Sequence, residues 1–141
     1  MKLSEKGRFA PPPRLEPTHA QALSETLASW ASVHARTHWL LGDESVVDGA
    51  DFYVGEEELG HLHLDGDAHV AVGPALRDVL VERRLARPFR WSREFVTWKV
   101  SSVASREHAE WLFSLRLAAL RGATPAELMT LVTTRADDVA A

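Results

Sequence analysis

The feature that most constrains the fold is a pair of alternating segments on either side of an Asp65-Gly66 turn. Residues 59–64 read Leu-Gly-His-Leu-His-Leu, and residues 68–72 read Ala-His-Val-Ala-Val. Alternating apolar and polar residues are typical of a half-buried strand, and Asp-Gly is a frequent hairpin turn. The pattern therefore predicts an antiparallel β-hairpin with one apolar face.

The register of this hairpin decides which side chains share a face. A three-residue turn at 65–67 predicts that residue 64 lies opposite residue 68, and residue 62 opposite residue 70. Because successive side chains of a strand point to opposite faces, this register collects the apolar side chains on the core face. It also collects three histidines on the other face: His61, His63 and His69.

Size and composition narrow the class of protein. A chain of 141 residues is long enough for one domain with its own core. The absence of cysteine excludes disulfides and thiolate sites, and the net charge of −4 argues against a nucleic-acid partner. No apolar run has the length of a membrane span, and the N-terminus has no secretory h-region. We therefore expect a cytoplasmic protein without a membrane or nucleic-acid partner; the oligomeric state stays open.

The remaining elements follow from caps, prolines and periodicity. Thr18 with Gln21 is typical of a capping box, and Thr124-Pro125 with Glu127 is another. Ser105 is the expected cap of the helix between them, which Gly122 ends. The predicted elements are a helix at 18–36, strands at 38–41, 51–54, 58–64 and 68–72, a polar turn at 42–50, a helix at 74–87, a strand at 93–101, a helix at 105–121 and a helix from 124.

This order, α-β-β-β-β-α-β-α-α, does not alternate strictly between strands and helices. It therefore favours an α+β fold with a single antiparallel sheet of about five strands and helices packed on one face. We expect a proline-rich N-terminal arm at 1–17, one α+β domain at 18–135 and a frayed tail at 136–141.

The three hairpin histidines are the first candidate site. Imidazoles at positions i and i+2 of a strand project in parallel, as a metal site requires. His61, His63 and His69 could hold Zn²⁺, Fe²⁺ or Mn²⁺, with Glu58, Asp65 or Asp67 as an oxygen ligand. They could equally serve acid–base chemistry, or form the solvated outer face of the sheet.

Two further groups are candidates for binding. Lys99 joins the three histidines on the predicted outer face, where a ligand could bind. His34 and His38 have the i, i+4 spacing of a helical metal pair, but Ala35 stands where the metalloprotease pattern needs Glu. Arginine side chains gather near the end of the second helix, where they could bind an anion or simply be solvated: Arg83, Arg84, Arg87 and Arg90.

Several of these segments resemble a small domain family known as the luciferase domain. The resemblance lies in Glu58-Leu59-Gly60-His61-Leu62-His63, the Asp65-Gly66 turn, the helix at 74–81 and Thr97-Trp98-Lys99-Val100. It covers about residues 40–120 and implies no particular reaction, cofactor or catalytic residue. The flavin-dependent luciferases are large β/α barrels, for which this chain is too short. The element order is also similar to that of YjbR and TfoX N-terminal domains.

Three functions remain open from the sequence. The first is a domain that binds a small ligand or a protein on the outer sheet face. The second is a small enzyme that depends on His61, His63 and His69, with or without a metal. The third is a structural or regulatory module that self-associates. The sequence leaves the reaction, the cofactor and the partner unknown.

Overall fold

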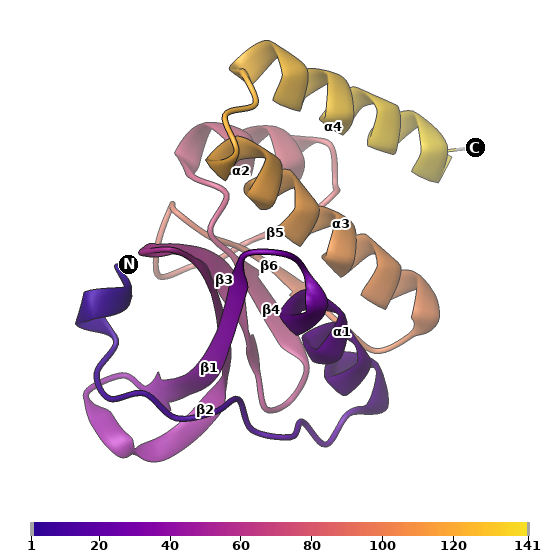
Figure 1. The fold of residues 1–141 in the computed structure, drawn as a ribbon. Coiled ribbons are helices and arrows are strands. Elements are labelled where there is room, and N and C mark those ends of the chain that lie inside the picture. Colours follow the sequence, from indigo (N-terminus) through magenta and orange to yellow (C-terminus); the bar gives the residue numbers. More distant parts are fainter. Residues whose placement is uncertain (1, 141) are drawn as a thin grey trace.

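A computed structural model describes residues 2–140. Its centre is a six-stranded antiparallel sheet with the strand order β1-β2-β3-β4-β6-β5 (Figure 1). The α+β class and the single antiparallel sheet are therefore confirmed, with one strand more than expected. The strands are β1 Val33–Leu40, β2 Asp43–Val54, β3 Glu57–His63, β4 Asp67–Val70, β5 Arg87–Pro88 and β6 Val96–Lys99.

The larger helices lie on one side of this sheet. α1 and α3 pack against each other and against the sheet, α4 lies on the outer side of α3, and α2 leads into β5 (Figure 1). None of the helices described is long and apolar enough to cross a lipid bilayer. The helices are α1 Thr18–Ser29, α2 Pro74–Glu82, α3 Val103–Leu120 and α4 Pro125–Ala140, with a short 3-10 turn, η1, at Leu3–Glu5.

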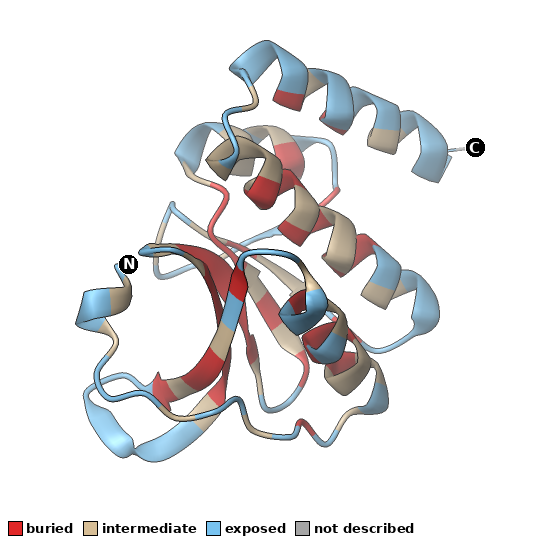
Figure 2. Cartoon of the chain, viewed as in Figure 1, coloured by how far each residue is buried: buried red, intermediate tan, exposed pale blue. Residues whose placement is uncertain are grey.

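The core lies between the helices and the inner sheet face, where buried residues concentrate (Figure 2). Phe52 of β2 meets Phe113 of α3 edge to face, at a centroid distance of 6.1 Å. Gly60 of β3 lies directly under Phe113, and a Cβ at this position would come within 2.8 Å of the ring. A glycine is thus required where α3 crosses the hairpin strand, because no side chain fits.

The N-terminal arm is held against β1. Arg36 donates to the carbonyl oxygens of Gly7 and Arg8, and the backbone N–H of Thr37 donates to the carbonyl of Ala10. Lys2 forms an isolated bridge with Glu57 of β3. An edge strand exposes unpaired backbone groups, and here the arm satisfies part of them.

Three segments differ from the predicted elements. The helix expected at 74–87 ends at Glu82, and Arg87–Pro88 form β5. The first helix ends at Ser29 rather than near Arg36, and residues 33–40 form β1. The helical spacing of Trp30 and His34 obscured the period-2 alternation that begins at Val33. Residues 43–50, expected as a turn, belong to β2; most of this stretch is exposed and lacks the apolar face that reveals a strand.

The hairpin register is shifted by two residues from the prediction. Leu62 lies opposite Ala68, and His61 lies opposite His69. A register shift of two residues leaves every side chain on its original face of the sheet, whereas a shift of one residue would move each side chain to the opposite face. The histidines therefore share a face as predicted, although Leu64 lies in the turn region and is exposed.

Two predicted caps are also different. α3 is capped by Ser102, whose side chain accepts from the N–H of Ser105, so Ser105 is the third helical residue and not the cap. Gln21 does not close a capping box with Thr18, because its side-chain oxygen accepts from the N–H of Leu15 instead.

Candidate metal centre

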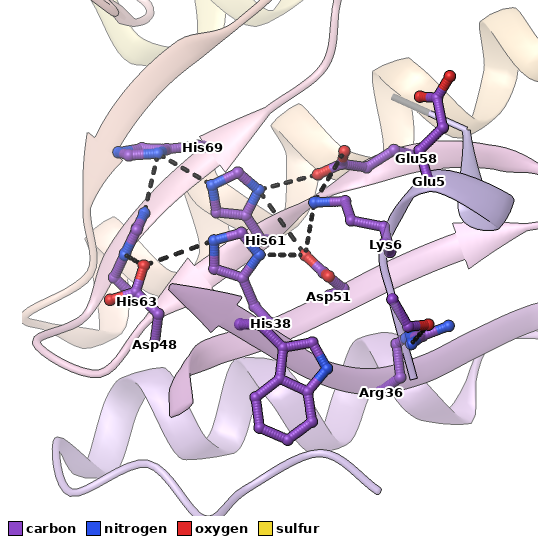
Figure 3. Close-up of polar contacts among 12 residues, drawn as sticks. Glu5, Lys6, Arg36, His38, Asp48, Asp51, Glu58, His61, His63 and His69 are labelled. Carbon is purple, nitrogen blue, oxygen red and sulfur yellow. Dashed lines mark hydrogen bonds and ion pairs between the residues drawn. The ribbon is translucent and has the colours of Figure 1, made fainter. Parts of the chain in front are cut away.

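Four histidines from three strands meet on the sheet face opposite the helices (Figure 3). β1 contributes His38, β3 contributes His61 and His63, and β4 contributes His69. The rings of His38 and His61 are stacked, with centroids 4.1 Å apart and planes 10° apart. Antiparallel pairing produces this cluster, because it places Asp51 of β2 between the β1 and β3 histidines.

The ring nitrogens of the hairpin histidines are close together. Nδ1 of His69 lies 3.1 Å from Nε2 of His61 and 3.2 Å from Nε2 of His63. One ligand atom from each of His38, His61 and His63 lies within 4.8 Å of the other two, whereas the predicted trio of His61, His63 and His69 is more widely spaced. All four imidazoles therefore border one small volume.

Carboxylates lie on the other nitrogen of three of these rings. Nδ1 of His61 is hydrogen-bonded to Glu58 at 2.8 Å. Nδ1 of His63 lies 3.1 Å from an oxygen of Asp48, and Nδ1 of His38 lies 2.8 Å from one of Asp51. An ionised carboxylate only accepts hydrogen bonds, so in His61 and His63 it favours the tautomer with the proton on the facing Nδ1, and Nε2 then presents its lone pair. Nε2 of His38 lies 3.5 Å from Asp48, so both nitrogens of this ring face carboxylates.

A β-bulge brings Glu58 to this face. Phe52 lies opposite Gly60 and the next residue, Tyr53, lies opposite Glu58, so Leu59 is the extra residue in β3. The extra residue reverses the alternation, which would otherwise point Glu58 toward the core. Leu59 is fully buried and Glu58 faces His61.

The inner part of the cluster is shielded from water. Asp51 and Glu58 are at most 1% exposed and His61 is 7% exposed. Lys6 of the N-terminal arm lies 3.5 Å from Asp51 and 3.6 Å from Glu58 (Figure 3). The outer sheet face is therefore covered at this end, and it is more open around His63 and His69.

Burial lowers the pKa values of two imidazoles of the cluster, His61 and His69. Desolvation, with repulsion from His38, lowers the pKa of His61 well below its ordinary value of 6.5. Desolvation, with repulsion from His63, lowers the pKa of His69 to about 4. Two aromatic rings add to this apolar environment: Phe89 lies 4.5 Å from the His69 ring, and Phe95 lies 5.6 Å from the His61 ring. Neutral imidazole is the form that binds a metal ion.

The other predicted site residues lie farther from the cluster. Lys99 is paired with Asp67 at the end of the sheet and donates to the carbonyl of Asp65. Neither acid lies in the groups that could hold an ion, in contrast to Glu58. The arginines are dispersed: Arg83 and Arg84 line a pocket behind the sheet, Arg87 begins β5, and Arg90 stacks over Trp91.

Sequence reasoning missed three residues of the cluster. His38 was considered only as the helical partner of His34, which lies on the exposed part of β1. Asp48 lies in the segment predicted as a polar turn, and Asp51 begins the strand predicted at 51–54. A single continuous strand at 43–54 would have placed Asp51 beside the hairpin histidines. The polar first half of this segment lacks the alternation that predicts a strand.

Fold and cluster together define a class: a small α+β domain whose sheet carries a group of imidazoles backed by carboxylates. Residues 56–120 match the family model of the luciferase domain, as the resemblance predicted. Comparisons with curated proteins and with solved structures found no match. The matched segment contains Glu58 and the three hairpin histidines, while His38, Asp48 and Asp51 precede it.

Proposed function

We propose that this domain binds one divalent transition-metal ion, held by His38, His61 and His63, with His69 as an adjacent fourth imidazole. This modifies the metal-dependent form of the second function considered from the sequence, in which His69 stood in place of His38. The observation that carries it is the spacing of the three imidazoles: one ligand atom from each lies within 4.8 Å of the other two.

Proton counting supports an ion at this point. With protons on the Nδ1 atoms that face Glu58 and Asp48, the two Nε2 atoms are both acceptors. His69 has one Nδ1 proton at most, and it faces two lone pairs. A single proton leaves one of these lone pairs without a donor, and a bound metal ion would satisfy it.

The spacing of the imidazoles and the partners of their other nitrogens also support an ion. Nitrogens bound about 2.0–2.1 Å from one tetrahedral ion lie about 3.3 Å apart, and the ligand atoms of His38, His61 and His63 already lie within 4.8 Å of one another. Carboxylates on the second nitrogen are the usual partners of metal-bound histidines, because they fix the ring and increase its basicity. A set of imidazoles favours Zn²⁺, Fe²⁺, Ni²⁺ or Cu²⁺ over Mg²⁺ or Ca²⁺.

The test is a calorimetric titration of chelator-treated protein with Zn²⁺, together with Co²⁺ absorption spectra that report ligand number. We expect about one ion per chain. The substitution His61→Gln should weaken binding by more than the 10- to 100-fold that loss of an outer partner costs. Asp48→Asn removes such a partner from His63 and should fall within that range.

His34→Gln is the matched control, since His34 lies on the same strand as His38 but outside the cluster. It should bind Zn²⁺ as the wild type does. Absence of saturable binding, or equal affinity in the His61→Gln and His34→Gln variants, would contradict the proposal. If the cluster binds no metal, acid–base chemistry by the same imidazoles becomes the favoured function.

A further inference from the structure

A half-open pocket of about 600 Å³ lies behind the sheet, bordered by α3, α4 and the turn after α2. This volume is within the range of small-molecule sites. The lining of this pocket differs from that of the histidine cluster, because most of its side chains are apolar or are arginines. Its apolar lining consists of Leu85, Trp98, Ala104, Ala136, Val139 and Ala140.

Three arginines and one acid line the same pocket. Arg83, Arg84 and Arg135 contribute positive charge, and Glu107 contributes the one carboxylate. Within residues 2–140 no ion pair joins any of these arginines to an acid. The lining of the pocket therefore carries an excess of two positive charges, three minus one.

Arg135 is held in place by a neutral group. The Nε2–H of His108 donates to the carbonyl of Leu85 at 2.6 Å, because a carbonyl oxygen only accepts. Nδ1 of His108 therefore accepts, and Nε and Nη2 of Arg135 donate to it at 3.1 and 2.9 Å. This chain orients the guanidinium without neutralising it, as an anion-binding arginine requires.

Arg84 adds a conformational observation. It follows the end of α2 with φ of 59°, in the left-handed region that glycine or asparagine usually occupies at this position. An arginine here carries a backbone cost that a glycine would avoid. The fold nevertheless positions this cation at the rim of the pocket.

We propose that this pocket binds an organic anion, in which a carboxylate or phosphate group meets Arg135 and Arg84 and a flat apolar portion lies against Trp98. The charge excess selects the anionic group, and the lining of Leu85 and Trp98 selects the apolar one. Such a ligand combines the two features, whereas an inorganic ion would use only the arginines.

Binding can be measured by calorimetry and by tryptophan fluorescence with phenyl phosphate, benzoate, inorganic phosphate and phenol. We expect saturable binding of phenyl phosphate or benzoate at one per chain, and the stronger of the two identifies the anionic group. Inorganic phosphate should bind at least tenfold more weakly, and phenol should not bind.

Arg135→Gln and Arg84→Gln should each weaken this binding at least tenfold, while Arg90→Gln should not, because Arg90 stacks on Trp91 outside the pocket. Arg84 is exposed, so its variant tests the site without threatening the fold. Equal losses in all three variants would indicate diffuse charge attraction and overturn the proposal, as would the absence of saturable binding. His61→Gln should leave the affinity for phenyl phosphate or benzoate unchanged, which separates this pocket from the metal centre.

Discussion

At the scale of single residues, the histidines divide by the partner of each ring nitrogen. His61 has a carboxylate on one side and imidazoles on the other. His108 has a carbonyl on one side and a guanidinium on the other. Both are buried and have lowered pKa values, but only His61 keeps a lone pair directed at other ligand atoms. Burial alone therefore does not distinguish a ligand from an orienting group.

His108 leads to a prediction about pH. Desolvation, with repulsion from Arg135, lowers the pKa of His108 below its ordinary value of 6.5. Below about pH 6.5 the unfolded chain takes up a proton that the folded chain does not, so stability falls as the pH falls. In urea titrations across pH 5–7, His108→Gln should flatten the pH slope of the unfolding free energy by up to about 1.4 kcal/mol per pH unit.

The comparison needs a control, since His61 and His69 contribute to the same slope. His34→Gln is the matched substitution at an exposed position, and a change of slope in His108→Gln beyond that in His34→Gln is specific to His108. Identical slopes in the wild type and the His108→Gln variant would show that His108 titrates normally in the folded protein.

At the scale of elements, β3 joins the core to the cluster. Its inner side lies under α3, its outer side carries His61 and His63, and the bulge at Leu59 turns Glu58 toward them. The sequence predicted this strand and its two faces from alternation. It did not predict the bulge, because one extra residue is indistinguishable from regular alternation until the partner strand is known.

The close contact of β3 with α3 can be tested by adding one methyl group. A Cβ at position 60 would lie 2.3 Å from the carbonyl oxygen of His69 and 2.8 Å from the Phe113 ring. Gly60→Ala should therefore destabilise the domain by about 1–3 kcal/mol, the usual cost of overpacking. Chemical denaturation measures the loss.

A double-mutant cycle with Phe113→Leu should reveal a favourable coupling of at least about 0.5 kcal/mol, because the smaller side chain relieves part of the clash. Strict additivity of the two substitutions, or an unchanged stability of Gly60→Ala, would contradict the packing described.

At the scale of the whole molecule, the N-terminal arm closes the face that the helices leave open. Lys6 is the arm residue that enters the cluster, and its side chain is 10% exposed beside carboxylates that are 1% exposed. The arm thereby converts part of a sheet surface into a second buried layer.

Removing this cation should be costly. Lys6→Gln leaves Asp51 and Glu58 without the ammonium group that lies between them, and breaking a buried ion pair costs about 3–5 kcal/mol. Lys2→Gln is the control: its pair with Glu57 is exposed, and its loss should change stability little. Thermal or urea unfolding measures the stability of both variants. Equal unfolding free energies would mean that the buried ion pairs of Lys6 do not stabilise the protein.

The sequence by itself determined the hairpin, the shared face of His61, His63 and His69, the α+β class and the family resemblance. These features depend on local alternation and turns, which survive even the two-residue error in register. Only the tertiary structure decided that His38, Asp48 and Asp51 join the cluster, that a bulge adds Glu58, and that Arg135 and Arg84 line one pocket. Such contacts join residues distant in sequence, and strand pairing and helix docking, rather than local pattern, bring them together.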